Sequence, residues 1–394
     1  MGDEAMDGLL TTRTGLDTVL GRINGQAVIG LDTEFVSERT YRPVLCLISL
    51  AWPGGQALLD VPALGDLSLL GHALGGDGGT VVLHAGSQDL PLLERHLGCR
   101  PGRVFDTQVA AAFLGHGQIG YQRLVGEVLG IRLQGDASFT DWTRRPLTRE
   151  QMDYAREDAA HLAPLYEVLS AELAQRGRLE WCWEECRRLG DRETAEPVPE
   201  EAWIRVDGAR RLGPRLLAVL RELAAWRERE ARQSDVPVGF VLRDSTLVAL
   251  ARQAPQDRNG LERVRGMAAG QIRRYGDQLL AAASRGLACP REAWPRPFES
   301  PGEDPAVRLA TDMLVSWVRK RSADEAITGP LLATREDIAE LMRWHRGLVP
   351  RDPQPRVLAG WRRSLVGEDL LDLLEGKRAL VFQRGELRLS GRPR

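Results

Sequence analysis

The segment AVIGLDTEFV (residues 27–36) constrains the fold more than any other part of the chain. Its first residues are apolar and suit a strand that is covered by other elements, whereas Asp32 and Glu34 do not. Residues two apart on a strand point to the same face, so the two carboxylates lie side by side. Burying such charges without a partner is costly. Either this strand edge faces water or something brings a cation to it.

Strand signals are concentrated in the first half of the chain. Short apolar runs bounded by turn residues predict strands at 27–36, 45–52, 56–61 and 80–85, the first three antiparallel and hairpin-like. Helical spacing follows at 86–98, ending at Gly98, and again at 147–173, where Thr148 and Gln151 suit a capping box. The alternation predicts an α/β domain with a mixed sheet.

Two proline-containing stretches divide the chain, GDRETAEPVPEE (190–201) and ACPREAWPRPFESPGEDP (288–305). They predict an α/β domain at 1–200 and two further domains at 205–290 and 305–394. The later domains show helical spacing and no good strand signals, which predicts two small all-α domains.

Charge is distributed unevenly between the two halves. Residues 201–394 hold 35 basic and 26 acidic side chains, whereas residues 1–200 hold 18 and 29. The basic half suits a polyanion such as single-stranded RNA, because arginine is interleaved with Trp, Tyr and Gly in stretches such as RVRGMAAGQIRRYG (263–276). The alternative is a set of solvated helix faces with acid–base pairs such as Glu228–Arg232.

Several classes of protein are disfavoured by simple patterns. No apolar run approaches the ~20 residues of a membrane span, and MGDEAMDGLL at the start does not resemble a signal peptide. Five scattered cysteines favour a reducing, cytoplasmic setting, and Cys182 and Cys186 fit a helix face better than a zinc site. The chain has no G-x-x-x-x-G-K-[ST] phosphate loop, so no ATP is expected.

Two further acids could join the first pair. In YAREDAAHL (154–162), Tyr154 and Asp158 share one face of the predicted helix, and Asp89 opens a helix directly after a strand. Each also has an ordinary explanation, because Asp158 could face water and Asp89 could simply favour the helix dipole. Divalent cations such as Mg²⁺ or Mn²⁺ prefer oxygen ligands, so a shared metal site would account for all four acids.

The order LDTEFV, HAGSQDL with FDTQ downstream, and YAREDAAHL resembles the three exonuclease motifs of the DEDD superfamily, in its tyrosine subtype. The stretches TEFVSERTYRPVLCLISLA and DWTRRPLTREQMDYAREDAAHL are more specifically similar to the ribonuclease D family. LRELAAWREREARQSDVPVGFVLRDSTLVALA resembles the helical HRDC domain that this family shares with RecQ-type helicases, and the last segment resembles a second, divergent HRDC domain in pattern.

The resemblance implies a ribonuclease H-like exonuclease domain followed by two HRDC-like domains. It implies that Asp32, Glu34, Asp89 and Asp158 bind two divalent ions, Mg or Mn, and that Tyr154 orients the attacking water. It further implies that the backbone around Thr33 and the side chain of Phe35 contact the terminal nucleotide, although Phe35 fits a core position equally well.

Three other residues are candidates for substrate contacts. His84 lies near Asp89, although a lone histidine at a strand end is more often structural. Trp142 and Arg145 could stack on a base or bind a phosphate, or could instead act as a hinge or cap before the helix.

The resemblance predicts a 3′→5′ exoribonuclease that releases nucleoside 5′-monophosphates from RNA with a free 3′ end, such as tRNA precursors. A monomer that acts without a membrane or ATP is expected. The alternatives are a DNA exonuclease with the same metal site and a non-catalytic nucleic-acid-binding protein.

Overall fold

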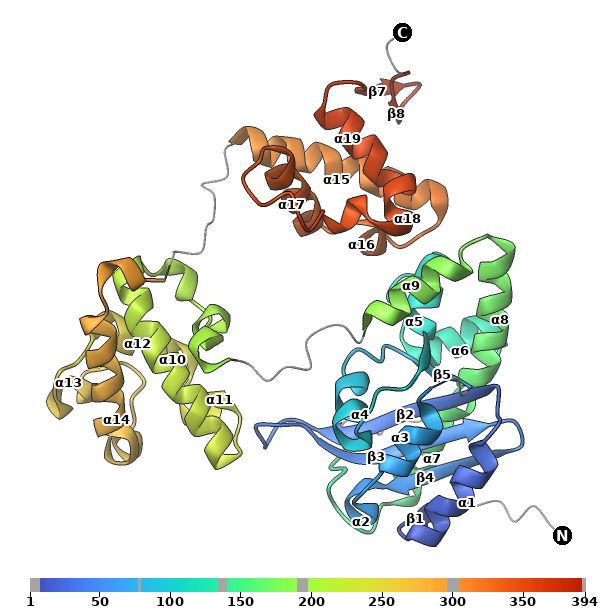
Figure 1. Ribbon diagram of the computed structural model, residues 1–394, viewed down its shortest axis with the longest axis horizontal. Helices are drawn as coiled ribbons and strands as arrows, with labels where there is room; N and C mark the ends of the chain where they lie inside the picture. Colours follow the sequence, from blue (N-terminus) through green and yellow to red (C-terminus); the bar gives the residue numbers. More distant parts are fainter. Residues whose placement is uncertain (1–7, 77–78, 134–139, 190–197, 296–304, 392–394) are drawn as a thin grey trace. The chain divides into compact units, whose positions relative to one another are not determined.

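The computed structural model describes residues 8–76, 79–133, 140–189, 198–295 and 305–391 (Figure 1). Residues 190–197 of the first predicted linker and 296–304 of the second lie outside these ranges, as do the first seven residues, on which the signal-peptide expectation depends. The chain forms two units, one from Met1–Glu34, Leu45–Arg192 and Glu303–Arg394, and the other from Phe35–Val44 and Glu193–Gly302. Among the described residues, no helix has the length and apolar character needed to cross a membrane.

The first unit contains a mixed sheet (Figure 1). Its strand order is β1-β4-β3-β2-β5-β6, and the strands are β1 (Leu9–Leu10), β2 (Val28–Val36), β3 (Val44–Trp52), β4 (Gly55–Asp60), β5 (Thr80–Leu83) and β6 (Arg103–Asp106). β3 and β4 form the predicted antiparallel hairpin, whereas β2 pairs with β5, and β5 with β6, in parallel. The mixed sheet is therefore confirmed. The sequence does not predict β1 and β6, because β1 has only two residues and β6 has only two apolar residues between Arg103 and Asp106.

Helices connect and cover these strands. They are α1 (Arg13–Ile23), α2 (Val61–Leu64), α3 (Ser68–Leu74), α4 (Asp89–Leu97), α5 (Thr107–Phe113), α6 (Tyr121–Leu129), α7 (Arg149–Ala160), α8 (Leu162–Gln175) and α9 (Leu179–Leu189). α7 contacts β4, α8 contacts β5 and α9 contacts β6. Gly98 ends α4 with a left-handed backbone, and Thr148 with Gln151 forms the predicted capping box of α7. The single predicted helix at 147–173 is wrong in one respect, because it breaks at His161 into α7 and α8.

The C-terminal segment belongs to the same unit and is not purely helical. It contains α15 (Pro305–Glu325), α16 (Gly329–Leu332), α17 (Arg335–His345), η4 (Arg356–Leu358), α18 (Gly360–Arg362), η5 (Arg363–Gly367) and α19 (Glu368–Leu374), followed by β7 (Leu380–Gln383) and β8 (Glu386–Leu389). The all-α prediction is wrong for this last part. Arg384 and Gly385 both have positive φ, which suits a two-residue hairpin turn between the strands.

A buried ion pair attaches this segment to α9. Both terminal guanidinium nitrogens of Arg362 donate to the carboxylate of Glu185 at 2.6 Å, and the indole of Trp361 donates to the same carboxylate at 3.1 Å. Arg362 is 0% exposed. This arginine of the stretch GWRRS (360–364) therefore has a structural role and is not available to a polyanion.

The second unit is helical apart from the segment Phe35–Val44. Its elements are η1 (Pro199–Arg205), η2 (Ala209–Arg211), α10 (Pro214–Ser234), α11 (Val238–Val241), α12 (Asp244–Gln253), α13 (Arg258–Glu262), α14 (Ala269–Ala288) and η3 (Arg291–Ala293). α10 packs along α14 around an apolar core. The expected Glu228–Arg232 pair forms at 3.7 Å, and Tyr41 donates its hydroxyl hydrogen to Glu228.

Candidate active site

Strand β2 presents Asp32 and Glu34 next to the end of α7. The close contact between β2 and α7 depends on Gly30, two residues before Asp32. A Cβ atom at this position would lie 2.7 Å from the carbonyl oxygen of Ala159. Contacts this short are essentially never made by real Cβ atoms. A glycine therefore allows the end of α7, with Asp158, to lie directly against the strand.

Three carboxylates meet at this point. Oxygen atoms of Asp32, Glu34 and Asp158 all lie within 4.8 Å of one another. Asp89, at the first position of α4, is not within this group, but its Oδ1 accepts a hydrogen bond from Thr33 Oγ1, and its charge acts on both Asp32 and Glu34. The four acids thus gather as the sequence predicts, three in direct proximity and Asp89 beside them.

Tyr154 lies one helical turn before Asp158. Its hydroxyl hydrogen-bonds to Asp158, and burial together with the charge of Asp158 raises its pKa above the ordinary value. The phenol is therefore neutral at physiological pH and can act as a hydrogen-bond donor. Trp142 lies beside it, with ring centroids 6.3 Å apart.

The sequence gives little sign of a further positioning residue, Asp106. Its carboxylate caps α5 by accepting hydrogen bonds from Gln108 and Val109, and it also accepts from the amides of Ala85 and Gly86 in the loop before Asp89. Ala85 has a φ of 56°, a strained value for a residue with a side chain. Asp106 of the FDTQ stretch therefore holds the loop before Asp89. In the sequence, the only sign of this residue is an aspartate between a strand and a helix, where an N-cap is expected.

The expectation that Trp142 stacks on a base is wrong for this structure. Its side chain is 1% exposed, so no base can reach the ring. Arg145 is likewise occupied, because its guanidinium donates to Asp60 at 2.5 and 2.9 Å and to the carbonyl oxygens of Cys46 and Trp142. Because Thr148 caps α7, these contacts instead fix the segment before the helix to β3 and β4.

The other expected substrate contacts differ in outcome. His84 has both ring nitrogens engaged, Nδ1 with Thr107 Oγ1 at 2.9 Å and Nε2 with the Ile119 carbonyl oxygen at 3.1 Å, so it is structural rather than substrate-binding. The Thr33 side chain is committed to Asp89. Contacts of the Thr33 backbone and of Phe35 with a nucleotide stay predictions.

The crowded acids raise one another's pKa. Burial raises the pKa of Asp32 well above its ordinary value, and the charges of Glu34, Asp158 and Asp89 add to this. Burial and the charges of Asp158 and Asp89 raise the pKa of Glu34 to about 9, and burial raises that of Asp89 to about 6. Such a set of oxygen donors fits a hard divalent cation, whose charge would offset the repulsion.

Removing divalent ions is expected to make the protein progressively less stable as the pH rises. Because the pKa of Glu34 is about 9 in the folded chain, against 4.5 for the free side chain, the folded state binds the extra proton between these values. The free energy of unfolding then falls by up to ~1.4 kcal/mol per pH unit in this window. A bound cation would favour the ionised carboxylates and remove this dependence.

Thermal melts with EDTA and with Mg²⁺ check this expectation between about pH 6 and about pH 9. The stabilisation by Mg²⁺ should grow toward higher pH. A Mg²⁺ effect of the same size at every pH, or none, would contradict a metal site at these acids.

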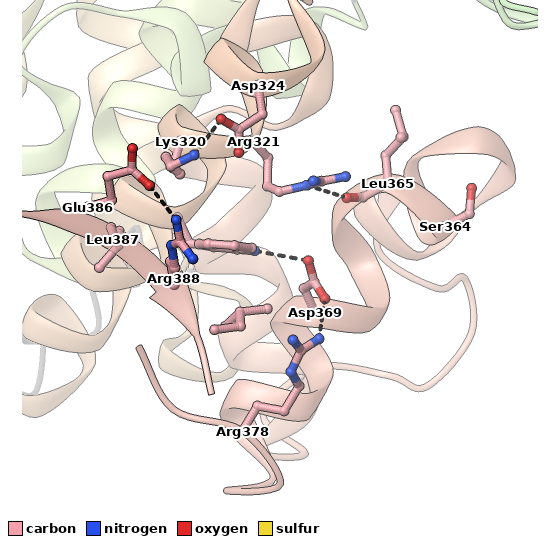
Figure 2. A pocket seen from close by; sticks show the side chains of 12 residues that line it. Lys320, Arg321, Asp324, Ser364, Leu365, Asp369, Arg378, Glu386, Leu387 and Arg388 are labelled. Carbon is pink, nitrogen blue, oxygen red and sulfur yellow. Dashed lines mark hydrogen bonds and ion pairs between the residues drawn. The ribbon is translucent and has the colours of Figure 1, made fainter. Parts of the chain in front are cut away.

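A separate hollow of about 550 Å³ lies in the C-terminal segment (Figure 2). Its cations face acids: Lys320 pairs with Asp324, Arg388 with Glu386 and Arg378 with Asp369. The fourth, Arg321, donates to the Leu365 carbonyl oxygen and to Glu325. Because these charges are matched, the hollow is not an obvious anion site.

A carboxylate cluster on a mixed sheet, closed by a helix that carries a tyrosine one turn earlier, defines the class of metal-dependent 3′–5′ exonucleases. The family described as "3'-5' exonuclease" matches residues 9–174. Two helical families follow, the HRDC domain at residues 216–282 and the C-terminal HRDC domain of ribonuclease D at residues 305–370.

Relatives match over nearly the whole length of the chain. Ribonuclease D of Escherichia coli is 36% identical over 93% of this chain and 98% of its own, and ribonuclease D of Gluconacetobacter diazotrophicus is 37% identical over 94% of each. The crystal structure of the Escherichia coli enzyme superposes with a TM-score of 0.86 over 94% of this chain and 98% of that one. The chain belongs to the ribonuclease D family, a family of exoribonucleases, and the predicted resemblance is confirmed.

Proposed function

We propose that this chain removes nucleoside 5′-monophosphates one at a time from the free 3′ ends of RNA, with tRNA precursors and small structured RNAs as substrates. The observation that carries the proposal is the group of three carboxylates within 4.8 Å, with Tyr154 hydrogen-bonded to one of them. The crystal structure of the Escherichia coli relative is described as that of an exoribonuclease involved in structured RNA processing. We expect a cytoplasmic monomer, and its five free cysteines suit a reducing compartment.

The four acids and the tyrosine would divide the chemistry between them. Asp32, Glu34, Asp89 and Asp158 would hold two Mg²⁺ or Mn²⁺ ions, which when bound lower the pKa of water and stabilise the leaving 3′ oxygen. Oxygen atoms of Asp32 lie within 4.8 Å of those of both Glu34 and Asp158, so Asp32 would share the metal ligation with both. Asp89, held by Thr33, would bind directly or through water. The neutral hydroxyl of Tyr154 would orient the attacking water.

The domains would divide binding and cleavage. We propose an exonuclease domain at 1–200, an HRDC domain at 205–290 and a second HRDC-like domain at 305–394. The excess of basic over acidic residues in 201–394 supports RNA binding there. Part of the arginine set instead forms ion pairs, such as Arg258–Asp277 at 2.9 Å, so the binding surface is smaller than the arginine count suggests.

Matched oligonucleotides test the proposal. We expect mononucleotides from RNA with a 3′-hydroxyl in Mg²⁺ or Mn²⁺, slower release from DNA of the same sequence, and none from RNA with a 3′-phosphate or in EDTA. Faster release from DNA would favour the DNA-exonuclease alternative. RNA binding without any cleavage would favour a non-catalytic binding protein.

A further inference from the structure

Two features lie at the break between α7 and α8. Pro164, near the start of α8, has no N–H to donate to the Ala160 carbonyl oxygen, and the hydroxyl of Tyr121 enters the preceding rung of the ladder. In an uninterrupted helix, the backbone N–H of His161 would donate to the carbonyl oxygen of Glu157, four residues earlier. Instead, His161 N donates to the hydroxyl of Tyr121 at 3.3 Å, and that hydroxyl donates to the Glu157 carbonyl oxygen at 3.0 Å. One side-chain hydroxyl is thus inserted into a single rung of the helical ladder, a known cause of helix kinks.

We propose that Tyr121 is a positioning residue for the catalytic centre, whose hydroxyl bridges Glu157 and His161 at the break between α7 and α8 and thereby sets Asp158 against Asp32 and Glu34. Asp158 is the residue directly after Glu157, whose carbonyl group receives the hydroxyl. The inference rests on the metal-binding role proposed above for Asp158.

The ring of Tyr121 is fixed by its packing against His84. Tyr121 is the first residue of α6, and its ring packs edge-on against His84 with centroids 5.6 Å apart. His84 is fixed in turn by Thr107 and Ile119. Burial, followed by the charge of Asp158, raises the pKa of Tyr121, so its hydroxyl keeps the proton that it donates to Glu157. This accounts for His84 near the site without a substrate contact.

The turn at the break presses directly on the catalytic strand. The Cβ position of Gly30 lies 2.7 Å from the Ala159 carbonyl oxygen and 3.0 Å from Leu162 Cβ, so residues on both sides of the break touch β2. Gly30 is two residues before Asp32. A shift of the turn would therefore change the spacing of the carboxylates that lie within 4.8 Å.

Tyr121→Phe tests the role because it keeps the ring and removes only the hydroxyl. We expect the His161 N–H to bond directly to Glu157, Mn²⁺ affinity to fall by ~10–100-fold, and kcat to fall at fixed Mn²⁺ with KM for RNA unchanged. Hydrogen exchange at the His161 amide, followed in peptides covering 157–165, should become slower, since the direct bond to Glu157 restores that rung of the helix. Loss of packing alone would make it faster.

Tyr166→Phe on α8 is the matched control, because its ring packs edge-on against Phe105 at 4.9 Å, away from the break. It should leave Mn²⁺ affinity and exchange at 157–165 unchanged. Parental Mn²⁺ affinity in Tyr121→Phe would overturn the proposal, as would faster exchange across α7 and α8. Asp158→Asn distinguishes a failure of the proposed metal site from a failure of the role of Tyr121. If Asp158→Asn also keeps the parental Mn²⁺ affinity, the metal site is wrong. If Asp158→Asn loses affinity and Tyr121→Phe does not, only the role of Tyr121 is wrong.

Discussion

Replacing Asp158 by asparagine is expected to reduce exonuclease turnover to the background of the assay while making the metal-free protein more stable. The amide keeps the shape of the side chain but removes one of three carboxylates that lie within 4.8 Å. Metal binding then loses a charged oxygen ligand, and the charge that raises the pKa of Asp32 and Glu34 disappears. In EDTA the melting temperature should rise by about 2–4 °C for each kcal/mol of repulsion relieved.

Asp153→Asn is the control for this experiment. Asp153 lies on the same helix, α7, but its side chain is 57% exposed and pairs with Arg156 at the surface. The same substitution there should leave turnover and the EDTA melt close to those of the parent. Turnover of Asp158→Asn within about tenfold of the parent would contradict the proposed site, since an essential ligand is worth more than a positioned proton donor.

Local spacing explains why the acids and Tyr154 can be predicted from sequence. Two residues along a strand and four along a helix fix which side chains share a face, so the relation of Asp32 to Glu34 and of Tyr154 to Asp158 survives any arrangement of the domain. The capping box at Thr148 is similarly local. The meeting of β2 and α7 is different, because local spacing does not predict it. The resemblance implies it, and the structure shows that Gly30 lets the end of α7 lie against β2.

The partners of the remaining residues come from distant parts of the chain. Arg145 is engaged by Asp60, 85 residues away, and the His161 N–H bonds to the hydroxyl of Tyr121, 40 residues away. Patterns within a window of some fifteen residues cannot contain such contacts. This is why the structural contacts of His84, Trp142 and Arg145 could not be predicted from the sequence. Pro164 is the one local sign of the break that the sequence contains.

Tyr154→Phe is expected to lower kcat by about 10²–10⁴-fold, the usual contribution of a positioned proton-handling group. The substitution removes the hydroxyl that hydrogen-bonds to Asp158 but leaves all four carboxylates in place. Mn²⁺ affinity should therefore stay within a few-fold of the parent, unlike that of Asp158→Asn. Tyr166→Phe, the same change on α8, should have no effect on kcat.

The pH dependence of this loss distinguishes two roles for Tyr154. Burial and the charge of Asp158 raise its pKa further above the ordinary value of 10.0, so the phenol stays protonated through the neutral and mildly alkaline range. If the hydroxyl only orients the water, the ratio of parent to Tyr154→Phe kcat should be the same at each pH from about 7 to about 9. If its ionised form were the general base, the ratio would rise about tenfold per pH unit over this range. A rising ratio would overturn the orienting role while leaving the metal site intact, because the acids that define it are unchanged in the variant.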